Sequence, residues 1–346
     1  MIDDITKFVR PNILALKPYS SARDEFSGSE GIFLDANENP YGNLNRYPDP
    51  HQKALKSKLS EIKKISADQI FIGNGSDEVI DLIYRIFCEP GESSAIVCPP
   101  TYGMYEVSAN INNVRLHRIP LTDDFQLDLE KILQTAGSDS SVKLIFICSP
   151  NNPTGNRLNN IGKLLDRFNG IVVADEAYID FCPEYSLKEK IGSHPNLIVM
   201  QTFSKARALA GVRIGMAFAG KKIISLLEKT KPPYNVSVLN QQAALEALAD
   251  ADEFEKRRNI ILQQRSHLVE ELAKLKIVKR IYPSDANFLL VEVSDADRVY
   301  RHLVEKQVII RNRTTQVTNC VRITVGTPDE NRQLLKELYL LDGSAR

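Results

Sequence analysis

Leu197-Ile-Val-Met-Gln-Thr-Phe-Ser-Lys205 is the stretch of this sequence that says most about its fold. Its first four residues form a continuous apolar run, which is typical of a strand buried on both faces in a parallel sheet. The run then ends in polar residues, with two hydroxyls before Lys205. Ligands of such sheets bind at the carboxyl ends of the strands, so this lysine could form an imine with an aldehyde cofactor. For an isolated motif, a solvated surface lysine is the simpler interpretation.

Six further apolar runs of similar length surround this stretch, and helical patterns separate them. They lie at 69–72, 95–98, 114–119, 144–148, 171–174 and 214–219. Alternation of buried strands with helices favours an α/β fold with a mostly parallel seven-stranded sheet, covered on both faces. We expect this sheet to form a large domain over residues 36–250.

The pattern changes beyond residue 250. Residues 251–275 read as one long, charged amphipathic helix, a common way of joining two domains. A smaller α+β domain over residues 251–346 is expected, because strands and helices alternate there at 279–282, 286–293, 295–306, 321–325 and 328–341. Residues 1–35 look irregular, and we expect this arm to pack with the small domain and a partner subunit.

The composition argues against several classes of function. The 346 residues contain 44 basic and 44 acidic side chains, so no basic excess points to nucleic acid or an anionic membrane. Five scattered cysteines without a CxxC pair favour free thiols in a reducing compartment and argue against a zinc site. No signal peptide is recognisable, and no apolar run approaches the roughly 20 residues that span a bilayer. A cytoplasmic protein without a bound metal is expected.

An acidic residue follows a second buried run, in Ile171-Val-Val-Ala-Asp-Glu-Ala-Tyr178. A buried carboxylate such as Asp175 needs a cationic partner, because burial otherwise penalises its ionised form. A protonated pyridine nitrogen would supply one, and Tyr178 would be within reach of a hydroxyl on the same ring. An aspartate that caps a helix N-terminus would give the same pattern without any cofactor.

Two more segments have polar residues that suit the same cofactor. Ser149–Gly155 is a run of seven turn-forming residues with two prolines, which can hold the Asn152 amide toward a ring oxygen, although an ordinary turn uses similar residues. Tyr102 follows two prolines and could offer an aromatic face to a planar ring, or could merely pack in the core.

Phosphate-binding groups can be recognised in two places. Gly73-Asn-Gly-Ser-Asp77 links a strand to a helix, so its backbone N–H groups could approach a phosphate at the helix N-terminus. It lacks the spacing of a P-loop or dinucleotide fingerprint, and an ordinary capping turn explains it equally well. Thr202 and Ser204 could donate hydrogen bonds to the same phosphate, and Arg213 could pair with it.

Together these motifs resemble the fold-type I pyridoxal-phosphate enzymes, and specifically the aspartate-aminotransferase-like group. Their order is that group's pattern: Asn-Pro-Thr-Gly from Asn152, then Asp175 with Tyr178, then Lys205 with Arg213. The match covers about residues 34 to 326. The resemblance implies that the cofactor is pyridoxal 5'-phosphate, that Lys205 forms its Schiff base, and that Asp175 charges the pyridine ring, with Tyr178 as a third catalytic residue.

The resemblance also implies roles for residues around the ring. Asn152 would bond the ring hydroxyl, and Tyr102 would stack on the pyridine ring. The phosphate would be held by Ser76, Asp77, Thr202, Ser204, Arg213 and, from the partner subunit of a homodimer, Tyr47.

Several stretches, among them Leu34-Asp-Ala-Asn-Glu-Asn-Pro-Tyr-Gly42 and Val321-Arg-Ile-Thr-Val-Gly326, are similar to the branch of this group that acts on histidinol phosphate. The resemblance implies that 2-oxoglutarate is the acceptor and becomes glutamate. It also implies that the anionic end of the substrate is bound by Arg322, with Arg311, Asn37 and Tyr19 as further candidates. Without the resemblance, the simplest interpretation of Arg322 is an arginine at a sheet edge that forms a surface salt bridge.

Other functions on the same scaffold stay open at this point. An aromatic amino-acid aminotransferase and a threonine-phosphate decarboxylase would keep the lysine, the aspartate and the asparagine. The chain departs from the group at Arg207, two positions after the lysine, where an uncharged residue is usual. We expect Arg207 either to face an interface or to add positive charge near the phosphates.

Overall fold

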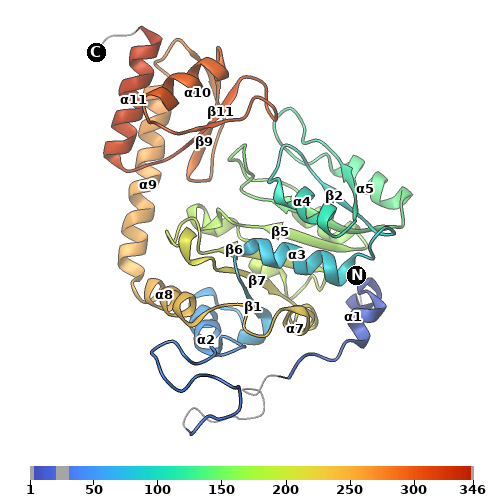
Figure 1. Ribbon diagram of the computed structural model, residues 1–346. Coiled ribbons are helices and arrows are strands. Elements are labelled where there is room, and N and C mark those ends of the chain that lie inside the picture. Colours follow the sequence, from blue (N-terminus) through green and yellow to red (C-terminus); the bar gives the residue numbers. More distant parts are fainter. Residues whose placement is uncertain (1–3, 21–30, 344–346) are drawn as a thin grey trace.

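The structure is a computed structural model that describes residues 4–20 and 31–343. It contains two sheets, each with its own covering helices (Figure 1). The larger sheet has seven strands between residues 70 and 219, and the smaller has four strands between residues 278 and 324. The α/β fold predicted from the sequence is confirmed.

The seven-stranded sheet has the strand order β1-β7-β6-β5-β4-β2-β3. Strand β7 runs antiparallel to its neighbours β1 and β6, and the other pairs are parallel. Except at the edge strand β3, the strands are almost entirely buried, which explains why they read as continuous apolar runs. Their bounds are β1 (Ile70–Gly73), β2 (Ser94–Val97), β3 (Arg115–Arg118), β4 (Val142–Cys148), β5 (Ile171–Asp175), β6 (Leu197–Thr202) and β7 (Gly215–Ala219).

Helices cover both faces of this sheet, because alternate residues of each strand point to opposite sides. Ile198 of β6, for example, joins the core on one face and Val199 joins the core on the other. The first core is completed by α3 (Ser76–Phe87), α4 (Met104–Ile111) and α7 (Lys221–Thr230). The second is completed by α2 (Lys53–Lys63), α5 (Leu129–Ser138), α6 (Ile161–Arg167) and α8 (Val238–Ala249).

The smaller sheet is antiparallel, with the order β10-β11-β9-β8. Strands β8 (Val278–Ile281), β9 (Phe288–Val293) and β11 (Cys320–Thr324) match predicted runs, whereas β10 (Arg311–Asn312) was not predicted because two polar residues give no strand pattern. The helices are α9 (Ala251–Leu272), α10 (Ala296–Glu305) and α11 (Pro328–Asp342). Figure 1 shows α9 running along one side of the molecule, from α8 up to the small sheet and α11.

The N-terminal arm differs from the expectation. It forms a 3₁₀ turn at Ile5–Phe8 and a short helix α1 at Pro11–Ala15. Ile5, Phe8, Val9 and Ile13 are buried in the core of the large domain, on the face that α3 and α7 cover. The described part of the arm therefore packs on the large domain, not with the small domain, because its apolar residues gain burial there.

Two further properties concern the whole described chain. All five cysteines are free thiols, and all five are buried. No helix within residues 4–20 and 31–343 has both the length and the apolar character that a bilayer span requires.

Candidate active site

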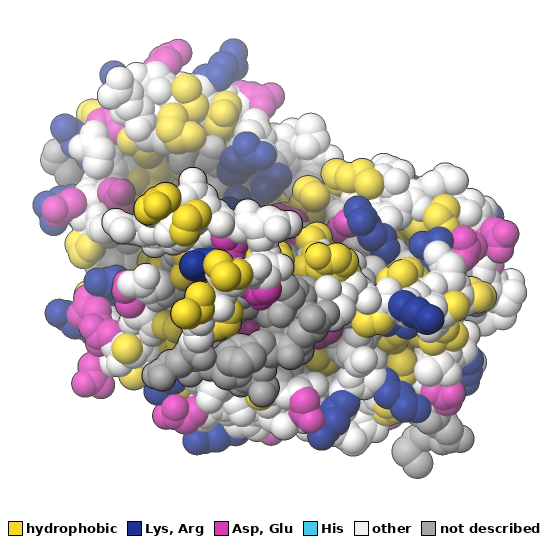
Figure 2. Space-filling model, turned by 60° about the horizontal axis from the view of Figure 1, so that its bottom comes forward, with side chains coloured by type: hydrophobic (Ala, Val, Ile, Leu, Met, Phe, Trp, Pro, Cys, Tyr) yellow, Lys and Arg dark blue, Asp and Glu magenta, His cyan; other side chains and the backbone are white. Residues whose placement is uncertain are grey.

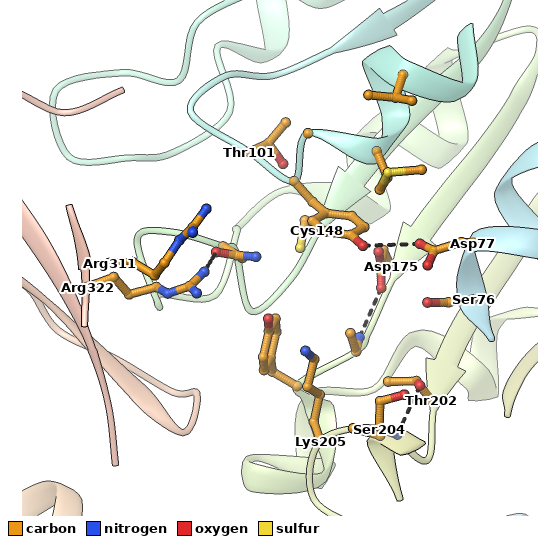
Figure 3. A pocket seen from close by; sticks show the side chains of 18 of the residues that line it. Ser76, Asp77, Thr101, Cys148, Asp175, Thr202, Ser204, Lys205, Arg311 and Arg322 are labelled. Carbon is orange, nitrogen blue, oxygen red and sulfur yellow. Dashed lines mark hydrogen bonds between the residues drawn. The ribbon is translucent and has the colours of Figure 1, made fainter. Parts of the chain in front are cut away.

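A cavity of about 580 Å³ lies at the carboxyl ends of the central strands, where the small domain faces the large sheet. The loops after β4, β5 and β6, the start of α3 and the strands β10 and β11 all contribute side chains to it. Figure 3 shows Lys205 rising into the space, with Ser76, Asp77 and Asp175 toward one side and Arg311 and Arg322 toward the other. The fold thus brings together residues that lie up to 246 positions apart, from Ser76 to Arg322.

Lys205 projects from the loop that follows β6, and its side chain is accessible from the cavity. Its Nζ lies 5.6 Å from the centroid of the Tyr178 ring. Burial lowers the pKa of the Lys205 amine, and the nearby Arg322 guanidinium lowers it further, while Asp175 and Asp77 act in the opposite direction. The amine therefore loses its proton more readily than that of a surface lysine, as a nucleophile or a general base requires.

Asp175 is the last residue of β5 and has only 3% of its surface exposed. One carboxylate oxygen accepts a hydrogen bond of 2.6 Å from the Tyr105 hydroxyl, and the other accepts one of 3.0 Å from the backbone N–H of Ala177. Burial raises the pKa of Asp175, and these hydrogen bonds counteract that shift. Within the described part of the chain, no lysine or arginine forms an ion pair with it, so the buried carboxylate suits a cationic ring nitrogen.

An anion cradle lies at the start of α3. This helix begins at Ser76 without a side-chain cap, so its first N–H groups are free to bind an anion. Gly75, with φ +78°, lets the Arg213 guanidinium lie against the backbone, since an added Cβ would come within 2.6 Å of its nitrogen. Gly215 allows a similarly close approach to the backbone N of Ser76. The Asp77 carboxylate contacts Arg213 at 3.3 Å and holds the guanidinium in place.

The predicted hydroxyl donors lie beside this cradle. Thr202 and Ser204 both line the cavity. The Thr202 hydroxyl donates to the Ile214 carbonyl at 3.2 Å and accepts from the Ser204 N–H at 3.1 Å. Thr202 therefore braces the loop that carries Lys205, and the Ser204 side chain is the freer of the two hydroxyls for binding an anion.

Three residues line the space where a ring would lie. The Tyr102 hydroxyl donates to Asp77 at 3.1 Å, which fixes its ring at the wall of the cavity. The Asn152 side-chain oxygen accepts a short hydrogen bond from Arg322. The Tyr178 ring packs edge-on against Phe288 of β9, with centroids 5.1 Å apart. The large and small domains therefore meet directly at the cavity.

The small domain supplies the positive end of the cavity. Arg311 of β10 pairs with Arg322 of β11 in the antiparallel register, so the two side chains are cross-strand neighbours. Burial lowers the pKa of Arg322, and its Nε is buried without a hydrogen-bond partner. Arg313 and Gln316 line the same end, although neither was singled out from the sequence. The Arg-Asn-Arg spacing is the signal that could have identified Arg313, since residues two apart share one side of a strand.

Four residues that the sequence brought into consideration lie outside this cavity, namely Tyr47, Asn37, Tyr19 and Arg207. Tyr47 stacks on Tyr234, with ring centroids 4.4 Å apart, and it lines a second cavity together with Asn37. Tyr19 is 72% exposed. Arg207 stacks on Phe254 and donates to the Ala247 carbonyl at 3.4 Å, so it ties the Lys205 loop to the junction of α8 and α9 and adds no charge to the anion cradle.

Tyr105 is a further residue that sequence reasoning missed. It is fully buried on α4, and its hydroxyl reaches across to Asp175 on β5. Cys148, at the end of β4, is buried and also lines the cavity. Neither role can be deduced from a local pattern, because each depends on which strand ends meet in space.

A buried carboxylate, a lysine with a lowered pKa and an anion cradle would all be engaged at once by a phosphorylated pyridine aldehyde. On a mostly parallel seven-stranded sheet with a small antiparallel domain beside it, they define the fold-type I class of pyridoxal-phosphate enzymes.

Comparison with known proteins narrows this class. The family model "Aminotransferase class I and II" matches residues 32–338. Histidinol-phosphate aminotransferase of Cytophaga hutchinsonii is 52% identical, over 98% of this chain and 99% of the relative, and that of Flavobacterium johnsoniae is 50% identical over the same shares. The crystal structure of histidinol-phosphate aminotransferase from Sinorhizobium meliloti in complex with pyridoxal-5'-phosphate matches with a TM-score of 0.77 at 25% identity, covering 87% of this chain and 84% of that one.

The chain belongs to the class I and II aminotransferase family. Enzymes of this family depend on pyridoxal 5'-phosphate, which is therefore the cofactor of this protein.

Proposed function

We propose that the protein transfers the amino group of L-histidinol phosphate to 2-oxoglutarate, giving imidazole-acetol phosphate and L-glutamate, as a step of histidine biosynthesis. The observation that carries this proposal is about 50% identity, over nearly the whole chain, to relatives named histidinol-phosphate aminotransferase. The arginine-rich end of the cavity supports it, because a phosphorylated donor needs such an end. Aromatic amino-acid transamination and threonine-phosphate decarboxylation are not favoured by these relatives.

The residues around the cavity fit the cofactor, and we assign them accordingly. When bound, pyridoxal phosphate supplies an aldehyde that condenses with amines and a protonated pyridine ring that accepts electrons. The backbone N–H groups of Ser76 and Asp77, with Ser204, Thr202 and Arg213, would hold its phosphate. Its ring would be held by the side chains of Tyr102, Asn152, Asp175 and Tyr178.

Asp175 keeps a proton on the pyridine nitrogen in this proposal. Its carboxylate is ionised when paired with that nitrogen, because the attraction between opposite charges in a buried site outweighs the desolvation that raises its pKa. Tyr105 and the Ala177 N–H orient the two carboxylate oxygens so that the charge faces the ring. Fixed electrostatic groups of this kind are usually the largest contribution to catalysis.

Lys205 is the base that moves the proton at the substrate Cα. Burial and Arg322 lower the pKa of its amine, so a larger fraction is neutral and able to accept a proton near pH 7. The loop that carries Lys205 is fixed by the Thr202 hydroxyl and by Arg207, which limits the positions the amine can take.

The anionic end of each substrate would bind Arg322 and Arg311. Arg322 is held by the Asn152 side chain, and its guanidinium lies 5.3 Å from the centroid of the Phe288 ring. The planar guanidinium of an arginine can donate hydrogen bonds to a phosphate in one half-reaction and to a carboxylate in the other, which the proposed pair of substrates requires.

We further propose that the protein acts as a homodimer. Ile32, Leu34 and Tyr41 are more than 80% exposed, and Leu44 is 63% exposed. Figure 2 brings the bottom of Figure 1 forward and shows hydrophobic side chains on that face. A partner subunit packed on this face would cover the segment. In that arrangement Tyr47 would contact the cofactor phosphate of the partner subunit, and Asn37 and Tyr19 would be candidates for binding the substrate of the partner subunit. Five buried free thiols support a cytoplasmic location.

The absorption spectrum of the purified protein tests the catalytic proposal. We expect a visible cofactor band that shifts when histidinol phosphate is added and returns with 2-oxoglutarate, and we expect Lys205→Ala to lose that cycle. A band that tyrosine or phenylalanine shifts, and that histidinol phosphate leaves unchanged, would overturn the proposed substrate while keeping the class of enzyme.

A further inference from the structure

Arg313 lies at the substrate end of the cavity, beside Arg311 and Arg322. The antiparallel register places Arg311 opposite Arg322, and Arg313 follows two residues later on the same side. The backbone of Arg313 is fixed, since its N–H donates to the Cys320 carbonyl at 2.8 Å and its carbonyl accepts from Gln316 and Val317 at 2.8 Å each. Three guanidinium groups are thus held near one another by the fold, not gathered by chance on a mobile loop.

This cluster has no internal charge compensation. Among the residues that the structure describes, none of the three arginines forms an ion pair with an aspartate or glutamate, and the Nε atoms of Arg313 and Arg322 are buried without a hydrogen-bond partner. Burial and the two neighbouring arginines lower the pKa of Arg313 to about 10, so it still carries its charge at neutral pH. Like charges and unpaired buried donors destabilise a site unless an anion binds there.

The number of donors indicates which anion fits. One arginine fork satisfies a carboxylate, which has two oxygens and a single charge. A phosphate monoester carries a charge of about −1.5 to −2 at neutral pH and three acceptor oxygens, so it can engage more than one fork. The Arg322 fork already contacts Asn152, which leaves Arg311 and Arg313 as the groups with the most unused donors.

We infer that Arg313 adds a third guanidinium to the Arg322 and Arg311 pair assigned above to the anionic end of the substrate, and that Arg313 gives the subsite so completed its preference for a phosphate monoester over an uncharged or singly charged end. This inference rests on the proposed function, since histidinol phosphate carries such a group. Arg313 is a specificity-determining residue in this view, and it takes no part in the proton transfers at Lys205.

Two donors that differ only in the phosphate provide the test: histidinol phosphate and histidinol. We expect Arg313→Gln to lower kcat/KM for histidinol phosphate by roughly 10- to 100-fold, the size expected for losing charge-assisted hydrogen bonds. For histidinol, kcat/KM should change by no more than about twofold, because no phosphate is present. Arg313→Lys, which keeps the charge but loses the fork, should fall between the two. Arg332→Gln, at a side chain that is 75% exposed on α11, is the matched control and should leave both values unchanged.

Equal losses for both donors, or no loss for either, would overturn the role of Arg313. Calorimetric titration of the holoenzyme with inorganic phosphate and with acetate separates this role from the proposed function. If the wild type does not turn over histidinol phosphate but binds phosphate roughly tenfold more tightly than Arg313→Gln, the proposed function is wrong and the subsite stands. If it turns over histidinol phosphate and the variant binds phosphate equally well, the subsite is wrong and the function stands.

Discussion

Gly75 is the residue on which the anion cradle depends most directly, and Gly75→Ala should damage it in a measurable way. Its φ of +78° and ψ of 166° lie in a region that is essentially restricted to glycine. Forcing alanine into that region costs about 1–3 kcal/mol in the free energy of unfolding. The added Cβ would also lie 2.6 Å from the Arg213 guanidinium, which must then move away from the start of α3. Losing the charged hydrogen bonds of that guanidinium would weaken cofactor binding by roughly 10- to 100-fold.

Titration of the apoprotein with pyridoxal phosphate, followed by absorption, measures this effect, and thermal unfolding measures the strain. Gly192→Ala is the matched control, because nothing lies within 4 Å of the Cβ it would add. The control should keep the affinity of the wild type for the cofactor. If Gly75→Ala binds the cofactor as tightly as the wild type does, then Arg213 and the start of α3 do not hold the phosphate, and the assignment of the cradle is wrong.

Three further predictions concern buried groups near the site. Asp175→Asn removes the charge that holds the proton on the pyridine nitrogen, so kcat in steady-state assays should fall by roughly 100- to 1000-fold, and a smaller loss would argue against that role. Tyr105→Phe removes a hydrogen bond that lowers the pKa of Asp175, so that pKa should rise and the acid limb of the pH–rate profile should move to higher pH; an unchanged limb would mean that Tyr105 does not tune the carboxylate. Burial raises the pKa of Glu176 from 4.5 to about 7, so the folded state binds more protons and loses stability as pH rises through that window. Glu176→Gln should flatten the dependence of Tm on pH there, whereas Glu130→Gln, at an exposed side chain, should not.

The features that could be predicted from the sequence are those that depend on a single helix or strand. Strand β6 is buried along its whole length, so a continuous apolar run indicates where the strand lies and which lysine follows it. Strand β10 has only two residues, both polar, and exists because it pairs with β11, so no local pattern could indicate it. The position of Ile5 to Ile13 against the large domain could not be predicted for a related reason, because apolar residues indicate burial and do not indicate which domain buries them.

The same distinction explains which site residues were found. Asp175 ends a buried strand and Lys205 follows one, and such positions can be recognised in the sequence because ligands bind at the carboxyl ends of strands. Tyr105 acts on Asp175 across 70 positions, and nothing in the run from Met104 to Ile111 distinguishes it from a tyrosine that only packs. The residues assigned to the cofactor at strand ends have a local sequence signal, whereas a residue that orients them, such as Tyr105, is recognised only from tertiary contacts.

The division of the site between two domains has a consequence for substrate binding. The residues assigned to the cofactor lie on the large domain. The three arginines assigned to the substrate lie on β10, on β11 and in the turn between them, and they are Arg311, Arg322 and Arg313. The two halves meet through the contact of Arg322 with Asn152 and the packing of Phe288 on Tyr178. A movement of the small domain would therefore change the distance between Lys205 and the arginines, and it would also alter the contacts that Asn152 and Tyr178 make with that domain. A substrate that spans both groups would favour the arrangement in which its amine and its phosphate are engaged together, so the phosphate can contribute to the positioning of the reacting amine as well as to binding.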